Sequence, residues 1–183
     1  MLTPLEIKNC YQNGDNISEL LRKSWNLVQN TPEVIEISYD MQAGTYVEEI
    51  LTNQDFAKHQ KLYTEEISKI ITSLCKPTSI LEAGVGEATT LSGVLQNLGN
   101  GVASYGFDIS WSRVACAKKC LCATKLNKTV LCTGDLFNIP FCSNSIDVVY
   151  TSHSMEPNGG NEETILSELW RVAKKYLILL EPG

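Results

Sequence analysis

The sequence predicts an α/β protein with a doubly wound, mainly parallel sheet and helices on both of its faces. Short apolar runs alternate with helical patterns from residue 79 onward, as they do when crossover helices connect parallel strands. The first of these runs, residues 80–83, leads into a turn with two glycines, Gly84 and Gly86, and then into a helical pattern. A strand, a tight glycine turn and a helix form the opening unit of a nucleotide-binding sheet.

The later elements continue the same alternation. Strands are expected at residues 80–83, 102–107, 129–132, 146–150 and 176–180, and helices at residues 89–98 and 110–126. Ser110 or Ser112 is expected to cap the second of these helices. Another helix is expected to begin after Asn161, which is its expected cap.

The chain divides into two parts by pattern. Residues 1–53 are expected to form a helical extension that lies over the site, and residues 54–183 the main domain. Within the extension, residues 17–28 carry apolar side chains at helical spacing, with Asn16 or Ser18 as the cap. The sequence therefore predicts one domain with a small helical appendage.

A second amphipathic helix links the extension to the first strand. Residues 55–75 place apolar side chains at the i, i+3, i+4 spacing, and Asp55 stands in the first turn. Gly44, before this helix, argues against one long unbroken helix in the extension.

The composition excludes several classes of protein. Of the 183 residues, 43% are hydrophobic and 20% are charged, which is typical of a water-soluble globular domain. The net charge of −6 argues against a large nucleic-acid interface, which needs clustered Lys and Arg. Residues 1–10 lack a signal-peptide pattern, and no apolar run approaches the ~20 residues of a membrane span. We expect a cytoplasmic protein that binds neither membrane nor nucleic acid.

The cysteines do not form a metal-binding pattern. There are seven of them and no Cys-x-x-Cys pair, and the two histidines, His59 and His153, follow no zinc spacing. An odd number of cysteines without an export signal favours reduced thiols. We therefore expect no metal site.

Two acidic residues stand where strands of such a sheet end. Glu82 places a carboxylate at the carboxyl end of the first strand, where open α/β sheets bind ligands. Asp108 ends the second strand, 22 residues after Gly86, and an acidic residue at this spacing binds the ribose hydroxyls of adenosine. The alternative is that Asp108 only caps the helix that follows.

Two further stretches indicate the family. The set Glu82, Gly84, Gly86 and Ala88 resembles the first motif of class I S-adenosyl-L-methionine (SAM) dependent methyltransferases, with Ala88 in place of the third glycine. A dinucleotide fingerprint would instead need glycine at position 89, where Thr89 stands. The stretches at residues 134–141 and 145–150, with an Asp, an Ile-Pro-Phe loop and an Asp-Val-Val strand, resemble later motifs of the same family.

This resemblance implies a Rossmann-like fold and a set of cofactor contacts. Asp135 would accept a hydrogen bond from the adenine amino group, the backbone of Leu136 would serve a ring nitrogen, and Ile109 would pack on the adenine face. The resemblance also places Ala83 and Thr151 among the cofactor-binding residues. Asp135 has an alternative role as a turn-stabilising residue after glycine.

Resemblance extends to the two sides of the expected pocket. Tyr39 and Tyr46 resemble the tyrosines of a lid that reach the cofactor or acceptor, or else they pack the extension onto the domain. His153 lies in a segment similar to the family's Ser-His-x-x-Glu-His stretch, with Pro157 in place of the second histidine. In such a segment the histidine acts as a general base or only shapes the pocket.

The implied activity is in-line transfer of the methyl group of SAM to an oxygen or nitrogen of a small-molecule acceptor, with S-adenosyl-L-homocysteine as the product. Two alternatives stay open, an NAD-linked oxidoreductase and a non-catalytic protein that keeps the fold. Binding titrations with NADH and with S-adenosylhomocysteine distinguish the oxidoreductase from the methyltransferase.

The end of the sequence carries a last expectation. The family normally adds a helix and two more strands after the fifth strand, and strands six and seven have no counterpart in residues 181–183. An uncovered strand edge promotes association. We expect either a fragment of a longer protein or an edge covered by the extension or by an oligomeric partner.

Overall fold

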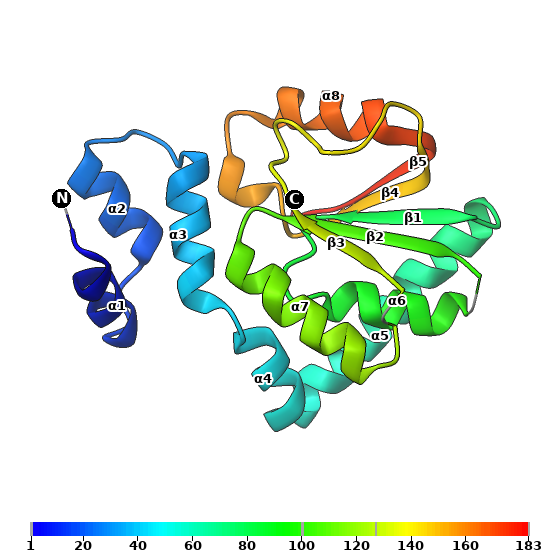
Figure 1. Cartoon of the computed structure of the whole chain (residues 1–183), viewed down its shortest axis with the longest axis horizontal. Helices are drawn as coiled ribbons and strands as arrows, with labels where there is room; N and C mark the ends of the chain where they lie inside the picture. The colour runs from blue at the N-terminus through cyan, green and yellow to red at the C-terminus, as the bar shows by residue number, and fades with distance from the viewer. Residues whose placement is uncertain (1, 100, 127, 183) are drawn as a thin grey trace.

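The computed structural model describes residues 2–99, 101–126 and 128–182, and within them five parallel strands form one sheet (Figure 1). The strands are β1 (Ser79–Ala83), β2 (Ala103–Asp108), β3 (Val130–Thr133), β4 (Ile146–Ser152) and β5 (Ala173–Leu180). Their order across the sheet is β3-β2-β1-β4-β5. The chain adds β2 and β3 on one side of β1 and then crosses to add β4 and β5 on the other side, so the topological switch point lies between β1 and β4. This arrangement confirms the predicted Rossmann-like fold, and it opens a crevice at the carboxyl ends of the central strands.

Helices cover both faces of this sheet. Those of the described residues are α1 (Pro4–Gln12), α2 (Ile17–Trp25), α3 (Pro32–Gln42), α4 (Thr45–Thr52), α5 (Gln54–Leu74), α6 (Thr89–Leu98), α7 (Trp111–Ala123), a 3-10 turn η1 (Glu156–Asn158) and α8 (Glu162–Val172). Figure 1 shows α5, α6 and α7 on one face and α8 on the other, with α1 and α2 set apart beyond α3. No helix formed by the described residues is long and apolar enough to span a membrane.

Local sequence explains where most helices begin. The side chains of Asn16, Asn53 and Ser110 each accept a hydrogen bond from a backbone N–H in the first turn of the helix that follows. Asn161 occupies the expected position before α8, but its side chain makes no capping bond there. Its predicted capping role is therefore wrong, although the position is correct.

Two helices end earlier than the apolar pattern predicts. The helix expected at residues 17–28 ends at Trp25, because Asn26 takes a left-handed conformation with φ of 58°. The helix expected at residues 110–126 ends at Ala123, where α7 gives way to a turn. Conversely, β5 begins at Ala173, directly after α8, which is earlier than expected.

Three apolar cores hold these layers together. One lies between the sheet and α5–α7 and includes Ile71, Ile80 and Leu91, and another lies on the α8 side of the sheet. The third joins α1, α2 and α3 around Leu21 and Val34. The amino-terminal helices thus have an apolar core of their own, while α3 and α4 lie beside the main domain.

A buried carboxylate at the opposite end of the sheet from the crevice fixes the start of β4. Asp147 accepts hydrogen bonds from the backbone N–H and the hydroxyl of Thr78, both at 2.8 Å, and pairs with Lys175 at 3.0 Å. These contacts, the Thr78 N–H first, lower the pKa of Asp147 to about 2. The carboxylate therefore joins the loop before β1 to β4 and β5.

We predict that Asp147→Asn destabilises the protein by about 2 kcal/mol at pH 7, because charge-assisted hydrogen bonds are lost. The pKa of Asp147 is lower in the folded protein than in the unfolded chain, so its contribution is complete above pH ~4 and is lost as the pH falls towards 2. Urea unfolding of both proteins at pH 7 and pH 3 measures this. A difference in unfolding free energy that is the same at both pH values contradicts the assignment.

Candidate active site

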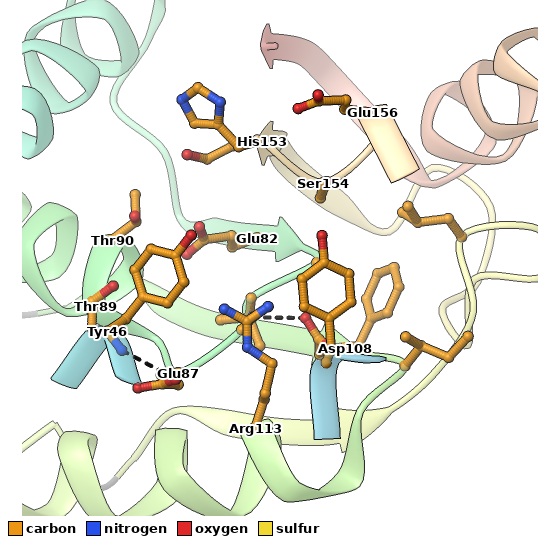
Figure 2. A pocket seen from close by; sticks show the side chains of 18 of the residues that line it. Tyr46, Glu82, Glu87, Thr89, Thr90, Asp108, Arg113, His153, Ser154 and Glu156 are labelled. Carbon is orange, nitrogen blue, oxygen red and sulfur yellow. Dashed lines mark hydrogen bonds between the residues drawn. The ribbon is translucent and has the colours of Figure 1, made fainter. Parts of the chain in front are cut away.

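A cavity of about 450 Å³ lies at the carboxyl ends of β1, β2 and β4, beneath α3, α4 and α5 (Figure 2). It is lined by most of the residues that the sequence motifs single out: Tyr39, Tyr46, Glu82, Gly84, Gly86, Asp108, Ile109, Asp135, Leu136 and His153. The parallel strands bring these distant parts of the sequence to one edge of the sheet.

The glycine turn after β1 forms the floor of this cavity. Gly84 and Gly86 both have positive φ angles, 75° and 52°, and a Cβ atom on Gly84 would lie 2.3 Å from the Cβ of Ser154. Ala88 also takes the left-handed conformation, at φ 58°, at the position of the family's third glycine. The turn therefore requires glycine at position 84, whereas it tolerates alanine at position 88.

Asp108 connects the glycine turn to the end of β2. Its carboxylate accepts hydrogen bonds from the Gly86 N–H at 2.8 Å and from the Ser110 N–H at 2.9 Å. Burial raises the pKa of Asp108, and the nearby Arg113 opposes that rise. Asp108 thus supports the turn from below and still lines the cavity with the acceptor capacity that remains.

Glu82 is buried deeper in the same wall. The residue is 2% exposed, and its carboxyl group accepts a hydrogen bond of 3.1 Å from the hydroxyl of Tyr150. Burial raises the pKa of Glu82 to about 8, against the lowering effect of that bond. An opposite charge in the cavity would favour the ionised form.

The adenine-side candidates lie together. Ile109, Asp135 and Leu136 all line the cavity. One oxygen of Asp135 accepts a hydrogen bond of 2.9 Å from the Phe137 N–H, which is the turn-stabilising role named as the alternative. Since a carboxylate accepts several hydrogen bonds, this contact leaves Asp135 able to bind a ligand.

Two of the predicted residues do not line the cavity. Ala83 and Thr151 are buried beneath the turn, in the paired register of β1 and β4. The Ala83 carbonyl accepts a hydrogen bond of 3.0 Å from the hydroxyl of Ser154. Their side chains therefore shape the floor from below, among the core residues.

His153 stands at the rim. It is exposed, its φ is 53°, and its backbone N–H donates a hydrogen bond of 3.0 Å to the carbonyl of Leu180. The ring lies 6.2 Å from that of Tyr63, whose hydroxyl shares a 2.9 Å hydrogen bond with Ser152. Figure 2 shows His153 and Glu156 at the same side of the cavity.

The structure adds two residues that the sequence analysis did not single out. The Arg113 guanidinium lies 4.8 Å from the ring centre of Tyr39 and 5.2 Å from that of Tyr46, and it lies over Gly86. Glu87, which is 2% exposed, accepts hydrogen bonds from backbone N–H groups at the start of α4. A charged residue inside a turn of small residues was the available signal for Glu87.

Acidic side chains outnumber basic ones around the cavity, although a pKa of about 8 keeps Glu82 mainly protonated at neutral pH. One cation, Arg113, and five acidic residues stand among the described residues that line it: Glu82, Glu87, Asp108, Asp135 and Glu156. Such a cavity favours cationic or neutral ligands over anionic ones. The described residues contain no group of three or more potential metal-binding side chains.

We predict that Glu82→Gln raises the melting temperature by a margin that grows from pH 5 to pH 8. The folded pKa of about 8 lies above that of the unfolded chain, so the glutamate costs stability as the pH rises between the two values. Glutamine keeps an acceptor for Tyr150 and removes the ionisation, and each kcal/mol corresponds to roughly 2–4 °C in chains of this size. Thermal unfolding at pH 5, 6.5 and 8 measures the margin, and a constant margin contradicts the prediction.

Comparison with solved structures shows the same fold elsewhere. A SAM-dependent methyltransferase from Aquifex aeolicus is 22% identical over 60% of this chain and 61% of its own, with a TM-score of 0.53. A proposed SAM-dependent methyltransferase from Methanococcus maripaludis is 18% identical over 72% of this chain and 63% of its own, with a TM-score of 0.56. The [4+2]-cyclase SpnF is 17% identical over 60% of this chain and 41% of its own, with a TM-score of 0.51. The chain thus spans less than two thirds of the length of these structures.

Sequence comparison gives the family directly. A search of curated proteins found no match. The sequence model of a family described as "Methyltransferase domain" matches residues 81–179, which is more than half of the chain. The match contains all of β2, β3 and β4 and most of β1 and β5. The chain therefore belongs to the class I family of SAM-dependent methyltransferases.

Proposed function

We propose that this protein binds SAM in the described cavity and transfers its methyl group to an oxygen or nitrogen atom of a small-molecule acceptor. One observation carries the proposal: the glycine turn after β1 is bonded to the acidic end of β2 through Gly86 and Asp108. Family membership and the negative cavity support the same conclusion. SAM is a net cation, with a sulfonium and an ammonium group against one carboxylate, and an acidic cavity favours a net cation.

The residues present fit this cofactor. Gly84 and Gly86 both line the cavity, and the absence of a side chain at Gly84 lets Ser154 pack directly against the turn. In the proposal, Asp108 holds the ribose hydroxyls, Glu82 faces the ligand's amino group, and Ile109 and Asp135 hold the adenine. These roles rest on the family resemblance and on the shared cavity wall.

When bound, SAM supplies an already activated methyl group. The protein then has to orient the acceptor in line with the carbon–sulfur bond and keep water away from it. Tyr39 and Tyr46 of α3 and α4 cover one side of the cavity for this purpose. A ring nitrogen of His153, at the rim, takes the proton that the acceptor loses. If an H153A protein had an unchanged kcat, His153 would only shape the pocket and would not act as the base.

The cavity also limits the acceptor. Since Arg113 is the one Lys or Arg among the described residues that line the cavity, and it lies between two tyrosine rings and beside Asp108, little positive charge remains for an anionic acceptor in addition to the carboxylate of SAM. We therefore propose a neutral or cationic acceptor.

We propose a separate surface for association with another chain. It is the outer edge of β5, where Leu179 is 45% exposed, and native mass spectrometry measures whether the protein associates.

Calorimetric titration tests the proposal in two arms. S-Adenosylhomocysteine should bind and NADH should not; the reverse result would overturn SAM as the cofactor and favour the oxidoreductase alternative. Incubation with methyl-labelled SAM and a cell extract, followed by identification of labelled metabolites, then tests transfer. Binding without any labelled product would favour a non-catalytic role or another chemistry on the same fold, as the name of the cyclase neighbour illustrates.

We predict that Asp108→Asn weakens binding of S-adenosylhomocysteine by roughly 1–3 kcal/mol, because the ribose hydroxyls lose a charged acceptor. The substitution keeps the size of the side chain, so the turn is disturbed less than by alanine. Glu163→Gln, on α8 and outside the cavity lining, is the matched control and should leave the dissociation constant unchanged. A folded D108N protein with native affinity would remove Asp108 from the site.

A further inference from the structure

Helix α4 begins without a capping side chain of its own. Its N-cap residue is Gly44, at φ 103°, which has no side chain to accept a hydrogen bond. The other helices of residues 2–99 that precede β1 are each capped by the side chain of their own N-cap residue, Thr or Asn. The free N–H groups at the start of α4 need another partner.

Glu87 supplies that partner from the glycine turn. One of its carboxylate oxygens accepts hydrogen bonds from the N–H of Gly44 at 2.9 Å and of Tyr46 at 3.4 Å, and the other from the N–H of Val47 at 2.8 Å. These are the N-cap, second and third positions of the helix, and a negative charge there also complements the helix dipole. A residue of the cofactor turn therefore caps the helix that covers the cavity (Figure 2).

The neighbouring helix docks in a similar way on the next turn. Asp40 of α3 accepts hydrogen bonds from the hydroxyl of Ser110 and from the N–H of Ser112 at 3.1 Å, at the start of α7. Residues 31–52, which we call the lid, are thus fastened to the turns that follow both β1 and β2. Arg113 lies between the lid tyrosines, Tyr39 and Tyr46, and over Gly86. Gly86 directly precedes Glu87 in the chain.

Detaching the lid has a cost at Glu87. Glu87 is 2% exposed with the lid docked, and when the lid detaches its carboxylate loses three N–H donors that water then has to replace. Glu87 directly follows Gly86, whose N–H is bonded to Asp108, so a rearrangement of Glu87 can pass to the glycine turn through the backbone. The docked lid and the present shape of the turn therefore stabilise each other.

We propose that Glu87 is a positioning residue that couples docking of the lid to the shape of the cofactor-binding turn, so that cofactor binding and lid docking strengthen each other. Any ligand that prefers the present turn shifts the lid towards its docked position, and a docked lid raises the affinity by the same factor. The effect on cofactor affinity rests on the proposed function, whereas the coupling of lid and turn does not.

Hydrogen exchange of the full chain tests this coupling without any ligand. Glu87→Gln removes the charge but nearly keeps the size, and Glu87→Asp keeps the charge with a shorter reach. We expect the amides of Tyr46, Val47 and Gly86 to exchange at least ~10-fold faster in E87Q, with E87D intermediate. Glu6→Gln is the matched control, because Glu6 likewise accepts a hydrogen bond from a backbone N–H, at the start of α1 and outside the cavity lining.

Affinity for S-adenosylhomocysteine is the second readout. E87Q should raise the dissociation constant roughly 5- to 50-fold and E6Q should leave it unchanged, while saturating ligand should slow exchange at Val47 in the native protein. Faster exchange at Val47 without a change at Gly86 would overturn the coupling, and unchanged exchange at Val47 would show that Glu87 does not hold the lid. If circular dichroism shows that E87Q is unfolded, two other measurements decide whether the coupling exists. They are the exchange rates of E87D and the slowing of exchange at Val47 by S-adenosylhomocysteine in the native protein. A native protein that binds no S-adenosylhomocysteine would overturn the proposed function, and the exchange at Gly86 would still decide the coupling.

Discussion

The hydrogen bond between the Gly86 N–H and the carboxylate of Asp108 is the contact on which the site depends. It joins the turn after β1 to the turn after β2, two segments 22 residues apart that pair as neighbouring parallel strands. The N–H groups of Gly84 and Val85 also donate hydrogen bonds to the carbonyl of Phe107, at 2.9 and 2.8 Å, and the Gly86–Asp108 bond extends this link to the carboxylate that lines the cavity.

Burial gives this contact its strength and also sets the electrostatics of the cavity. Asp108 and Glu82 both lie almost wholly away from solvent, and burial raises the pKa of each. Two carboxyl groups held in this way respond strongly to a positive charge that enters the cavity. The same burial that costs stability in the empty protein thus favours a cationic ligand.

The lid extends this logic to the amino-terminal helices. α1, α2 and one side of α3 pack in their own apolar core, whereas α3 and α4 also make polar contacts with the two turns. Polar contacts of this kind are directional, so they fix the lid in one position more than apolar packing alone would. Helix α4, whose cap comes from the glycine turn, is therefore part of the candidate site.

Local sequence determined the strands, the order of the elements and the positions of Gly84, Gly86 and Asp108, because apolar periodicity, turn chemistry and spacing act over a few residues to a few tens of residues. It also determined the starts of α2, α5 and α7, where a local side chain caps the helix. The apolar pattern did not predict that α2 and α7 end early, because the backbone conformation at the end of a helix overrides such a pattern. Only the tertiary structure decided that Glu87 caps α4 and that Arg113 lies between Tyr39 and Tyr46, since these partners stand 40 or more residues apart in the chain and meet only once the sheet has formed.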